Sequence, residues 1–176
     1  MPKAHCNKWL KMKSWKTKLF GREFKVTGLH ESAPVLDTVL DNPEMIVSYL
    51  RPQLPNSVRY NPDTENFIVV HMNTRRKPIG WEVVTNGTLD TLLVHAREVF
   101  KPAIVMAAAA IVLAHNHPSG DPGPSEADIK VTRDLIRAGQ LLKIEVLDHV
   151  ILGRATAERP KDFCSLRELG YFTAFG

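Results

Sequence analysis

His115-Asn116-His117-Pro118-Ser119-Gly120-Asp121-Pro122-Gly123-Pro124-Ser125-Glu126-Ala127-Asp128 is the stretch that says most about the fold of this 176-residue sequence. The apolar run 110–114 before it predicts a short strand that ends at His115. The proline and glycine residues of 121–124 predict a tight loop. Ser125 is expected to begin a helix, because apolar residues recur after it at helical spacing. The stretch therefore predicts a strand, a reversal of the chain and a helix.

The rest of the chain continues this alternation of strands and helices. Strands are predicted at 67–72, 79–85 and 144–152, and helices at 44–50 and 95–107. Residues 73–78 are expected to join two strands as a hairpin, and Asn86-Gly87 predicts a further turn. The tail has weak periodicity apart from a helical turn near Ser165 to Leu169. The pattern indicates an α/β sandwich with a mixed sheet.

Composition is that of a globular protein with one core. Hydrophobic residues make up 44% and charged residues 24% of the chain, which is ordinary for such a domain. No apolar run reaches the length of about 18 residues that spans a bilayer, and the first residues lack the apolar segment of a signal peptide. Cys6 and Cys164 form no CxxC pair and no disulfide framework. A cytoplasmic protein without a membrane partner is expected.

Positive charge is concentrated at the start of the chain. Residues 1–25 hold eight Lys or Arg against one Glu, a net +7, so the remainder carries −3 of the total +4. We therefore divide the sequence into a basic N-terminal extension, 1–34, and a domain, 35–176. Lysines interleaved with aromatic residues suit nucleic acid, and they are Lys8, Lys11, Lys13, Lys16 and Lys18. The alternative is a solvated arm whose aromatic residues pack on the domain, which we favour because no nucleic-acid-binding motif accompanies them.

Two histidines and one carboxylate in the quoted stretch have the spacing of a metal site. His115 and His117 lie two apart at a strand end and so share one side of the sheet. Asp128 lies in the first turn of the next helix, where it can face back toward them. Two nitrogens and one oxygen fit a catalytic zinc ion that keeps a fourth position for water. Each part of the motif, taken alone, also has an explanation without a metal. Two such histidines are typical of a surface pair, and Ser125 to Asp128 is typical of a capping box at a helix start.

These residues resemble a known family. His-x-His-Pro, six residues, then Ser-x-x-Asp is the signature of the JAMM (MPN+) metalloprotease domain. The longer pattern is similar to its bacterial RadC branch, in Asn86-Gly87-Thr88, Arg97-Glu98-Val99-Phe100, Leu147-Asp148-His149-Val150-Ile151-Leu152-Gly153 and Ser165-Leu166-Arg167-Glu168-Leu169-Gly170. The resemblance covers about residues 35–172 and implies an α/β/α sandwich of the JAB/MPN, cytidine-deaminase-like type. RadC proteins commonly carry a helix-hairpin-helix module ahead of this domain, for which 1–34 is too short.

The resemblance also implies a zinc-dependent peptidase or isopeptidase, whose substrate is an amide that the sequence does not identify. A glutamate at the start of an earlier strand would act as general base; Glu65 fits this place, and Glu98 is the competitor. Ser125 would hydrogen-bond the oxyanion, or would only cap the helix. The other functions left open are a catalytically silent binding module and a DNA-repair-associated accessory factor.

The sequence does not decide the roles of Asp148 and His149. Neighbouring strand residues face opposite sides, so at most one of the two can point into the site. One expectation is that His149 contacts a metal ligand or the substrate. The other is that it is a core histidine that hydrogen-bonds to the backbone.

Overall fold

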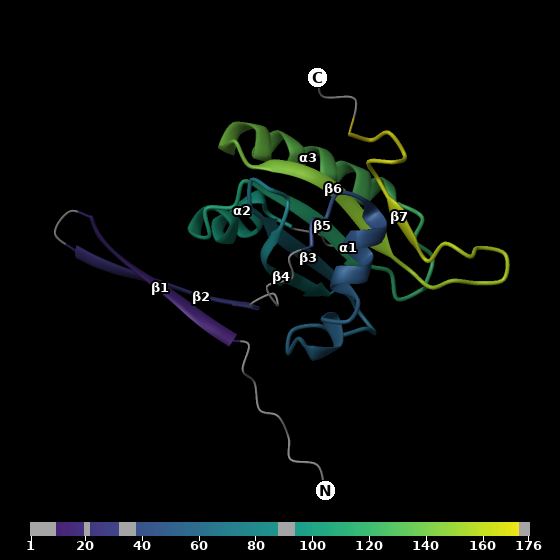
Figure 1. The fold of residues 1–176 in the computed structure, drawn as a ribbon, viewed down its shortest axis with the longest axis horizontal. Coiled ribbons are helices and arrows are strands. Elements are labelled where there is room, and N and C mark those ends of the chain that lie inside the picture. The colour runs from purple at the N-terminus through teal and green to yellow at the C-terminus, as the bar shows by residue number, and fades with distance from the viewer. Residues whose placement is uncertain (1–9, 20–21, 32–37, 88–93, 173–176) are drawn as a thin grey trace, which may run out of the picture.

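The computed structural model describes residues 10–19, 22–31, 38–87 and 94–172 (Figure 1). Its strands form one sheet in the order β1-β2-β4-β3-β5-β6-β7. The strands are β1 (Leu10–Leu19), β2 (Arg22–Glu31), β3 (Glu65–Met72), β4 (Pro78–Gly87), β5 (Ala110–Asn116), β6 (Glu145–Leu152) and β7 (Phe163–Ser165). The helices are α1 (Pro43–Leu50), a 3-10 turn η1 (Leu54–Asn56), α2 (Ala96–Val105) and α3 (Glu126–Leu142). Within the described ranges, no helix is both long and apolar enough to cross a bilayer.

The sheet is mixed, as predicted. β5 and β6 pair in parallel, whereas all the other neighbouring strands are antiparallel. Parallel neighbours need a long crossover, and here α3 supplies it. Because β5 leads into α3 and α3 returns to β6, the end of β5 and the start of α3 meet at one edge of the sheet.

Helices cover both faces of the sheet (Figure 1). Residues of β3 alternate between the two cores: Ile68 and Val70 pack in the cluster that includes α1, while Phe67 and Val69 pack in the cluster that includes α2 and α3. The central strands are therefore buried on both sides, which explains why their sequences are almost continuously apolar. This arrangement confirms the α/β/α sandwich.

In the domain itself, one predicted turn is wrong, and the short strand β7 was not predicted. Asn86 and Gly87 end β4, where they pair with Asn66 and Glu65 of β3. The Asn86 amide donates to Asn66 Oδ1 at 2.9 Å and to Arg59 O at 3.0 Å, so tertiary bonds hold it in the strand against its preference for turns. The three residues of β7 are too few to show a period of two.

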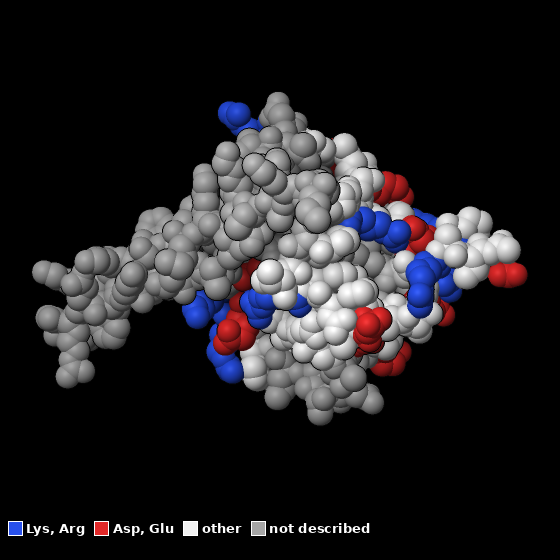
Figure 2. All heavy atoms as spheres, turned by 90° about the horizontal axis from the view of Figure 1, so that it is seen from below, with Lys and Arg blue, Asp and Glu red and all other residues white. Residues whose placement is uncertain are grey.

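The basic extension contains a hairpin that the sequence analysis did not predict. β1 and β2 pair along ten residues each, and β2 meets the rest of the sheet through one pair, Glu31 with Trp81. Lys8 lies outside the described residues, and the other four lysines of the nucleic-acid prediction lie on β1. Figure 2 shows the described Lys and Arg side chains of one face interspersed with Asp and Glu. The nucleic-acid prediction therefore rests on the extension and stays a prediction.

Candidate metal centre

The structure brings His115, His117 and Asp128 together at the end of β5. Their nearest ligand atoms all lie within 4.8 Å of one another. His115 Nε2 is 2.9 Å from His117 Nε2 and 3.2 Å from Asp128 Oδ1, and His117 Nε2 is 3.6 Å from Asp128 Oδ2. Ligand atoms about 2.0–2.2 Å from a tetrahedral zinc ion lie about 3.3–3.6 Å from each other. The two distances to Asp128 come close to this spacing, whereas the two nitrogens lie closer together than ligands of one ion would.

The hydrogen bond made by His117 fixes which of its nitrogens is free. His117 Nδ1 is 2.6 Å from the carbonyl oxygen of Asp121. Because a carbonyl can only accept, Nδ1 carries a proton, and in the neutral imidazole Nε2 then presents a lone pair toward His115 and Asp128. A lone pair beside a carboxylate is a favourable donor set for a cation, so these residues fit a bound divalent metal.

Burial and charge keep His115 and Asp128 in forms that can bind a metal. Burial lowers the pKa of His115 well below its ordinary value, which favours neutral imidazole. The neighbouring Asp128 carboxylate raises the pKa of His117, which favours its protonated form when no cation is bound. Burial opposes ionisation of Asp128, but His117, His115 and Ser125 outweigh it, and the pKa of the carboxyl falls well below its usual range. Asp128 is therefore a carboxylate at neutral pH.

Ser125 anchors this carboxylate at the start of α3. Asp128 Oδ2 accepts from Ser125 N at 2.7 Å and from Ser125 Oγ at 2.6 Å, and Asp128 N donates to Ser125 Oγ at 3.2 Å. The capping box predicted from the sequence is confirmed. With Oδ2 held by Ser125, Oδ1 is the oxygen left nearest to His115.

A close contact between two glycines fixes the loop that joins β5 to α3. A Cβ on Gly153 would lie 2.5 Å from the carbonyl oxygen of Gly120, closer than real Cβ atoms come. Arg154 N donates to this same Gly120 oxygen at 2.9 Å, and His117 N donates to Leu152 O at 2.9 Å. The loop therefore packs directly on the end of β6. This packing turns the chain back, so that Asp128 at the start of α3 lies beside the histidines.

Glu65 lies next to the metal-binding group, at the first residue of β3. Phe67 pairs with His115, so the antiparallel register, continued by two residues, sets Glu65 opposite His117. The half-buried Glu65 is among the charges that raise the pKa of His117, although it is the last of the causes. Glu98 lies in the first turn of α2 with its carboxylate 3.2 Å from Arg97 Nε, both side chains being at least half exposed.

A network of buried amides holds the start of β3 against the end of β5. Asn66 is fully buried, and its N and Nδ2 both donate to Asn116 Oδ1, at 3.0 and 2.8 Å. Asn116 Nδ2 in turn donates to Thr64 O at 2.9 Å. Because Glu65 lies between Thr64 and Asn66, and Asn116 between the two histidines, the network links the backbone of Glu65 to that of the metal-binding pair.

Comparison with known proteins agrees with this geometry. A family model described as RadC-like JAB domain matches residues 40–171. The chain belongs to the RadC family. The family recognised from the sequence is thereby confirmed, and its JAB domain accounts for the mixed sheet and the His-x-His loop of the structure.

Relatives of this RadC-family chain occur in several bacteria. A UPF0758 protein of Moorella thermoacetica is 51% identical over 116 residues, which are 66% of this chain and 48% of that protein. One of Symbiobacterium thermophilum is 40% identical over 153 residues, 84% of this chain and 61% of that protein. One of Caldanaerobacter subterraneus is 44% identical over 131 residues, 74% and 52% of the two chains. The chain thus spans about half to three fifths of the length of these relatives.

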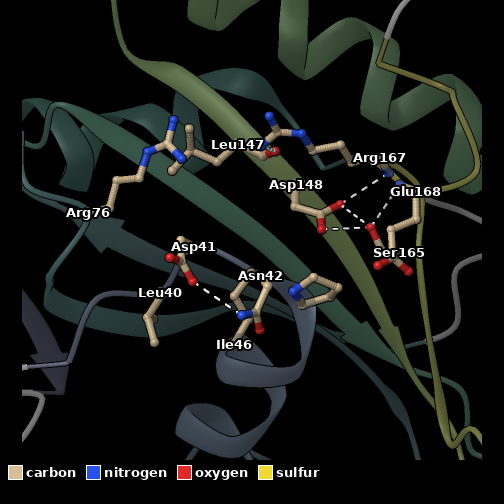
Figure 3. A pocket seen from close by; sticks show the side chains of 11 residues that line it. Leu40, Asp41, Asn42, Ile46, Arg76, Leu147, Asp148, Ser165, Arg167 and Glu168 are labelled. Atoms are coloured by element: carbon tan, nitrogen blue, oxygen red, sulfur yellow. Dashed lines mark hydrogen bonds between the residues drawn. The ribbon is translucent and has the colours of Figure 1, made fainter.

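Asp148 and His149 face opposite sides of β6 in this RadC-type domain, as strand geometry predicts. Figure 3 shows Asp148 directed at Ser165, whose hydroxyl lies 2.7 and 2.9 Å from its two carboxylate oxygens. It lines a cavity of about 410 Å³ beside α1, and burial raises its pKa. His149 lies on the other side, where it contacts His115 and Thr132, and burial lowers its pKa to about 4. Only His149 belongs to the metal centre.

A second cavity, of about 500 Å³, adjoins the centre at Asn116, His117 and Pro118. Its remaining walls include the apolar residues Leu54 and Leu152 and the basic residues Arg51 and Arg154. The His117 side chain is 12% exposed, whereas His115 and Asp128 are at most 1% exposed. A substrate in this cavity would therefore approach the centre from the side of His117.

Proposed function

We propose that this RadC-family domain is a zinc-dependent hydrolase that cleaves amide bonds of the peptide or isopeptide type. The observation that carries the proposal is the convergence of two imidazole nitrogens and one carboxylate beside an open cavity. Structural zinc sites are closed by four protein ligands, whereas catalytic sites have three and leave one position open. Over the described residues, the group that could hold a metal has three members.

The two-nitrogen, one-oxygen set favours zinc among the common metals. Mg²⁺ and Ca²⁺ prefer sites made of oxygen atoms, and imidazole ligands suit Zn²⁺ and other transition metals. When bound, a zinc ion supplies a Lewis acid that polarises a carbonyl and lowers the pKa of water from about 15.7 to about 7. His115, His117 and Asp128 would hold it, and the cavity at His117 would admit the amide.

Glu65 is the residue we assign to proton transfer. The strand register supports this assignment, because a carboxylate opposite His117 would lie beside the position where water would attack. Glu65 would accept a proton from the attacking water and deliver it to the nitrogen of the leaving amine. This exchange of one proton completes amide hydrolysis without a further acid or base.

The proposed hydrolysis is tested with the 176-residue chain and defined substrates. Zinc-loaded protein is incubated with a mixture of peptides and of peptides joined through a lysine Nζ, and products are identified by mass spectrometry. We expect cleavage at one class of amide bond, loss of cleavage after removal of the metal with a chelator, and recovery on adding zinc. Stoichiometric zinc without cleavage of either class would instead support a binding module.

Ser125 is proposed to donate to the oxyanion in addition to capping α3. The hydroxyl has one hydrogen, which Asp128 Oδ2 receives in this structure, so the role requires that hydrogen to turn toward the substrate. Ser125→Ala should cost about 1 kcal/mol of stability through the lost cap, whereas Ser125→Gly should cost only a few tenths. Both variants should lose about 10²–10³-fold in kcat. Turnover that instead follows the thermal stability of the two variants would reduce Ser125 to a cap.

A further inference from the structure

We infer that His149 and Thr132 are positioning residues that fix the tautomer of His115, so that its Nε2 lone pair faces the metal position. The inference builds on the metal site of the proposed function, but it concerns how this chain prepares a ligand. The sequence analysis left the role of His149 open and did not single out Thr132. Both lie behind His115, on β6 and on α3, and both are fully buried.

The direction of the hydrogen bonds is set at Thr132. Its Oγ lies 2.5 Å from the main-chain carbonyl oxygen of Asp128. Since a carbonyl carries no hydrogen, the hydroxyl donates its single hydrogen there. The same Oγ is 2.6 Å from His149 Nδ1, and toward this partner it can only accept. His149 therefore carries its proton on Nδ1.

The position of the proton on His149 then determines which nitrogen of His115 carries a proton. Both imidazoles are 0% exposed, and an imidazolium would be costly in such an environment. In neutral His149, a proton on Nδ1 leaves a lone pair on Nε2. This Nε2 lies 2.8 Å from His115 Nδ1, so His115 must donate from Nδ1. Its Nε2 is then bare and faces His117 and Asp128.

The carbonyl of Asp121 independently fixes His117 in the same tautomer. The two bare Nε2 atoms lie 2.9 Å apart, an arrangement in which two lone pairs repel each other unless a cation or a proton lies between them. The hydrogen-bonded chain from His115 through His149 and Thr132 also ends on the main chain of Asp128. It therefore joins two of the three ligands and resists rotation of the His115 ring.

Packing supports the same role. The Phe67 ring meets His149 edge-on with ring centroids 5.5 Å apart, and it lies nearly parallel to His115 at 6.4 Å. An apolar ring on this side helps to exclude water. A water molecule can both donate and accept a hydrogen bond, so it would stabilise either tautomer of His115. Partners behind a metal-binding histidine typically contribute 10–100-fold in metal affinity, and here a second histidine fills a place commonly taken by a carboxylate or a carbonyl.

The tautomer is measured directly by NMR of the metal-free, full-length protein labelled with ¹⁵N-histidine. Long-range ¹H–¹⁵N correlations at pH 8 should show His115 and His149 protonated on Nδ1. This measurement needs no variant. A His115 ring protonated on Nε2 in the native protein would overturn the inference.

Substitution then tests the chain of bonds through metal affinity. Thr132→Val keeps the volume of the side chain but removes its hydroxyl; it should mix the tautomers of His115 and weaken zinc binding about 10–100-fold. Thr132→Ser should restore both. Ser165→Ala is the matched control, because it removes a buried hydroxyl that binds Asp148 on the opposite face of β6. It should lower Tm and leave tautomer and affinity unchanged.

A second position covers the case in which Thr132→Val does not fold. His149→Gln keeps an amide oxygen that can accept from His115 and should bind zinc more tightly than His149→Leu, which offers no acceptor. Equal zinc affinity in these two variants, or native affinity in Thr132→Val, would overturn the inference. The result is separable from the proposed function, since metal affinity and tautomer are read without any turnover. A protein with the expected tautomer that cleaves no amide would contradict only the proposed hydrolysis.

Discussion

His117→Ala is expected to weaken zinc binding by far more than about 100-fold, because the loss of a partner behind a ligand already costs 10–100-fold. The variant removes one of three ligand atoms and leaves the other two in place. It should keep its fold, since the His117 side chain is the most exposed of the three. Zinc content after gel filtration, beside isothermal titration, measures the effect.

Two further variants make this measurement specific. Asp128→Asn keeps an oxygen that can accept from Ser125 N and so preserves the helix cap, but it removes the negative charge; it should also lose zinc. His95→Ala is the matched control, because His95 precedes α2 and makes no side-chain cap bond. It should bind zinc as the native protein does. One zinc ion per chain in His117→Ala would show that the metal is held elsewhere.

The parts of the site that were predictable from sequence are those fixed by local geometry. His115 and His117 share a side because strand residues alternate, and Asp128 returns to them because a short loop joins β5 to a capped helix. Each step spans a few residues. A capping box and a ligand role for Asp128 are compatible at a helix start, and the geometry agrees, because Ser125 holds Oδ2 while Oδ1 lies nearest to His115.

The parts that were not predictable depend on pairing between distant segments. His149, which the sequence left open between a residue behind a ligand and a core histidine, reaches His115 across 34 residues and Thr132 across 17. Thr132 lies among the buried residues of α3. Its spacing of four from Asp128 is the signal that could have marked it, since a hydroxyl at that distance can bond the earlier carbonyl. The wrong turn at Asn86-Gly87 has the same origin, because bonds to Asn66 and Arg59 override a local preference.

The place of Glu65 also follows from long-range register. The sequence left Glu65 and Glu98 as competing bases and favoured Glu65 through resemblance to the family. The pairing of Phe67 with His115 supplies the physical reason, since it carries Glu65 to the end of β5 that bears the histidines. Glu98 instead pairs with Arg97 at the surface of α2.

Glu65→Gln is accordingly expected to bind zinc with native affinity and to lose about 10²–10⁴-fold in kcat, the usual contribution of a general acid–base group. Glutamine keeps the length of the side chain and can still hydrogen-bond water, but it cannot take up a proton. The measurement is steady-state turnover of the cleaved amide, with zinc content determined on the same samples. Glu98→Gln is the matched control and should keep native turnover.

The comparison of the two glutamine variants decides the assignment. If Glu65→Gln loses turnover but keeps its zinc, the defect lies in proton transfer and not in assembly of the centre. Its residual rate should also lose the dependence on pH that ionisation of the base produces in the native protein. Full turnover in Glu65→Gln together with loss in Glu98→Gln would transfer the role to α2, and would require that helix to move its first turn away from Arg97 and toward His117.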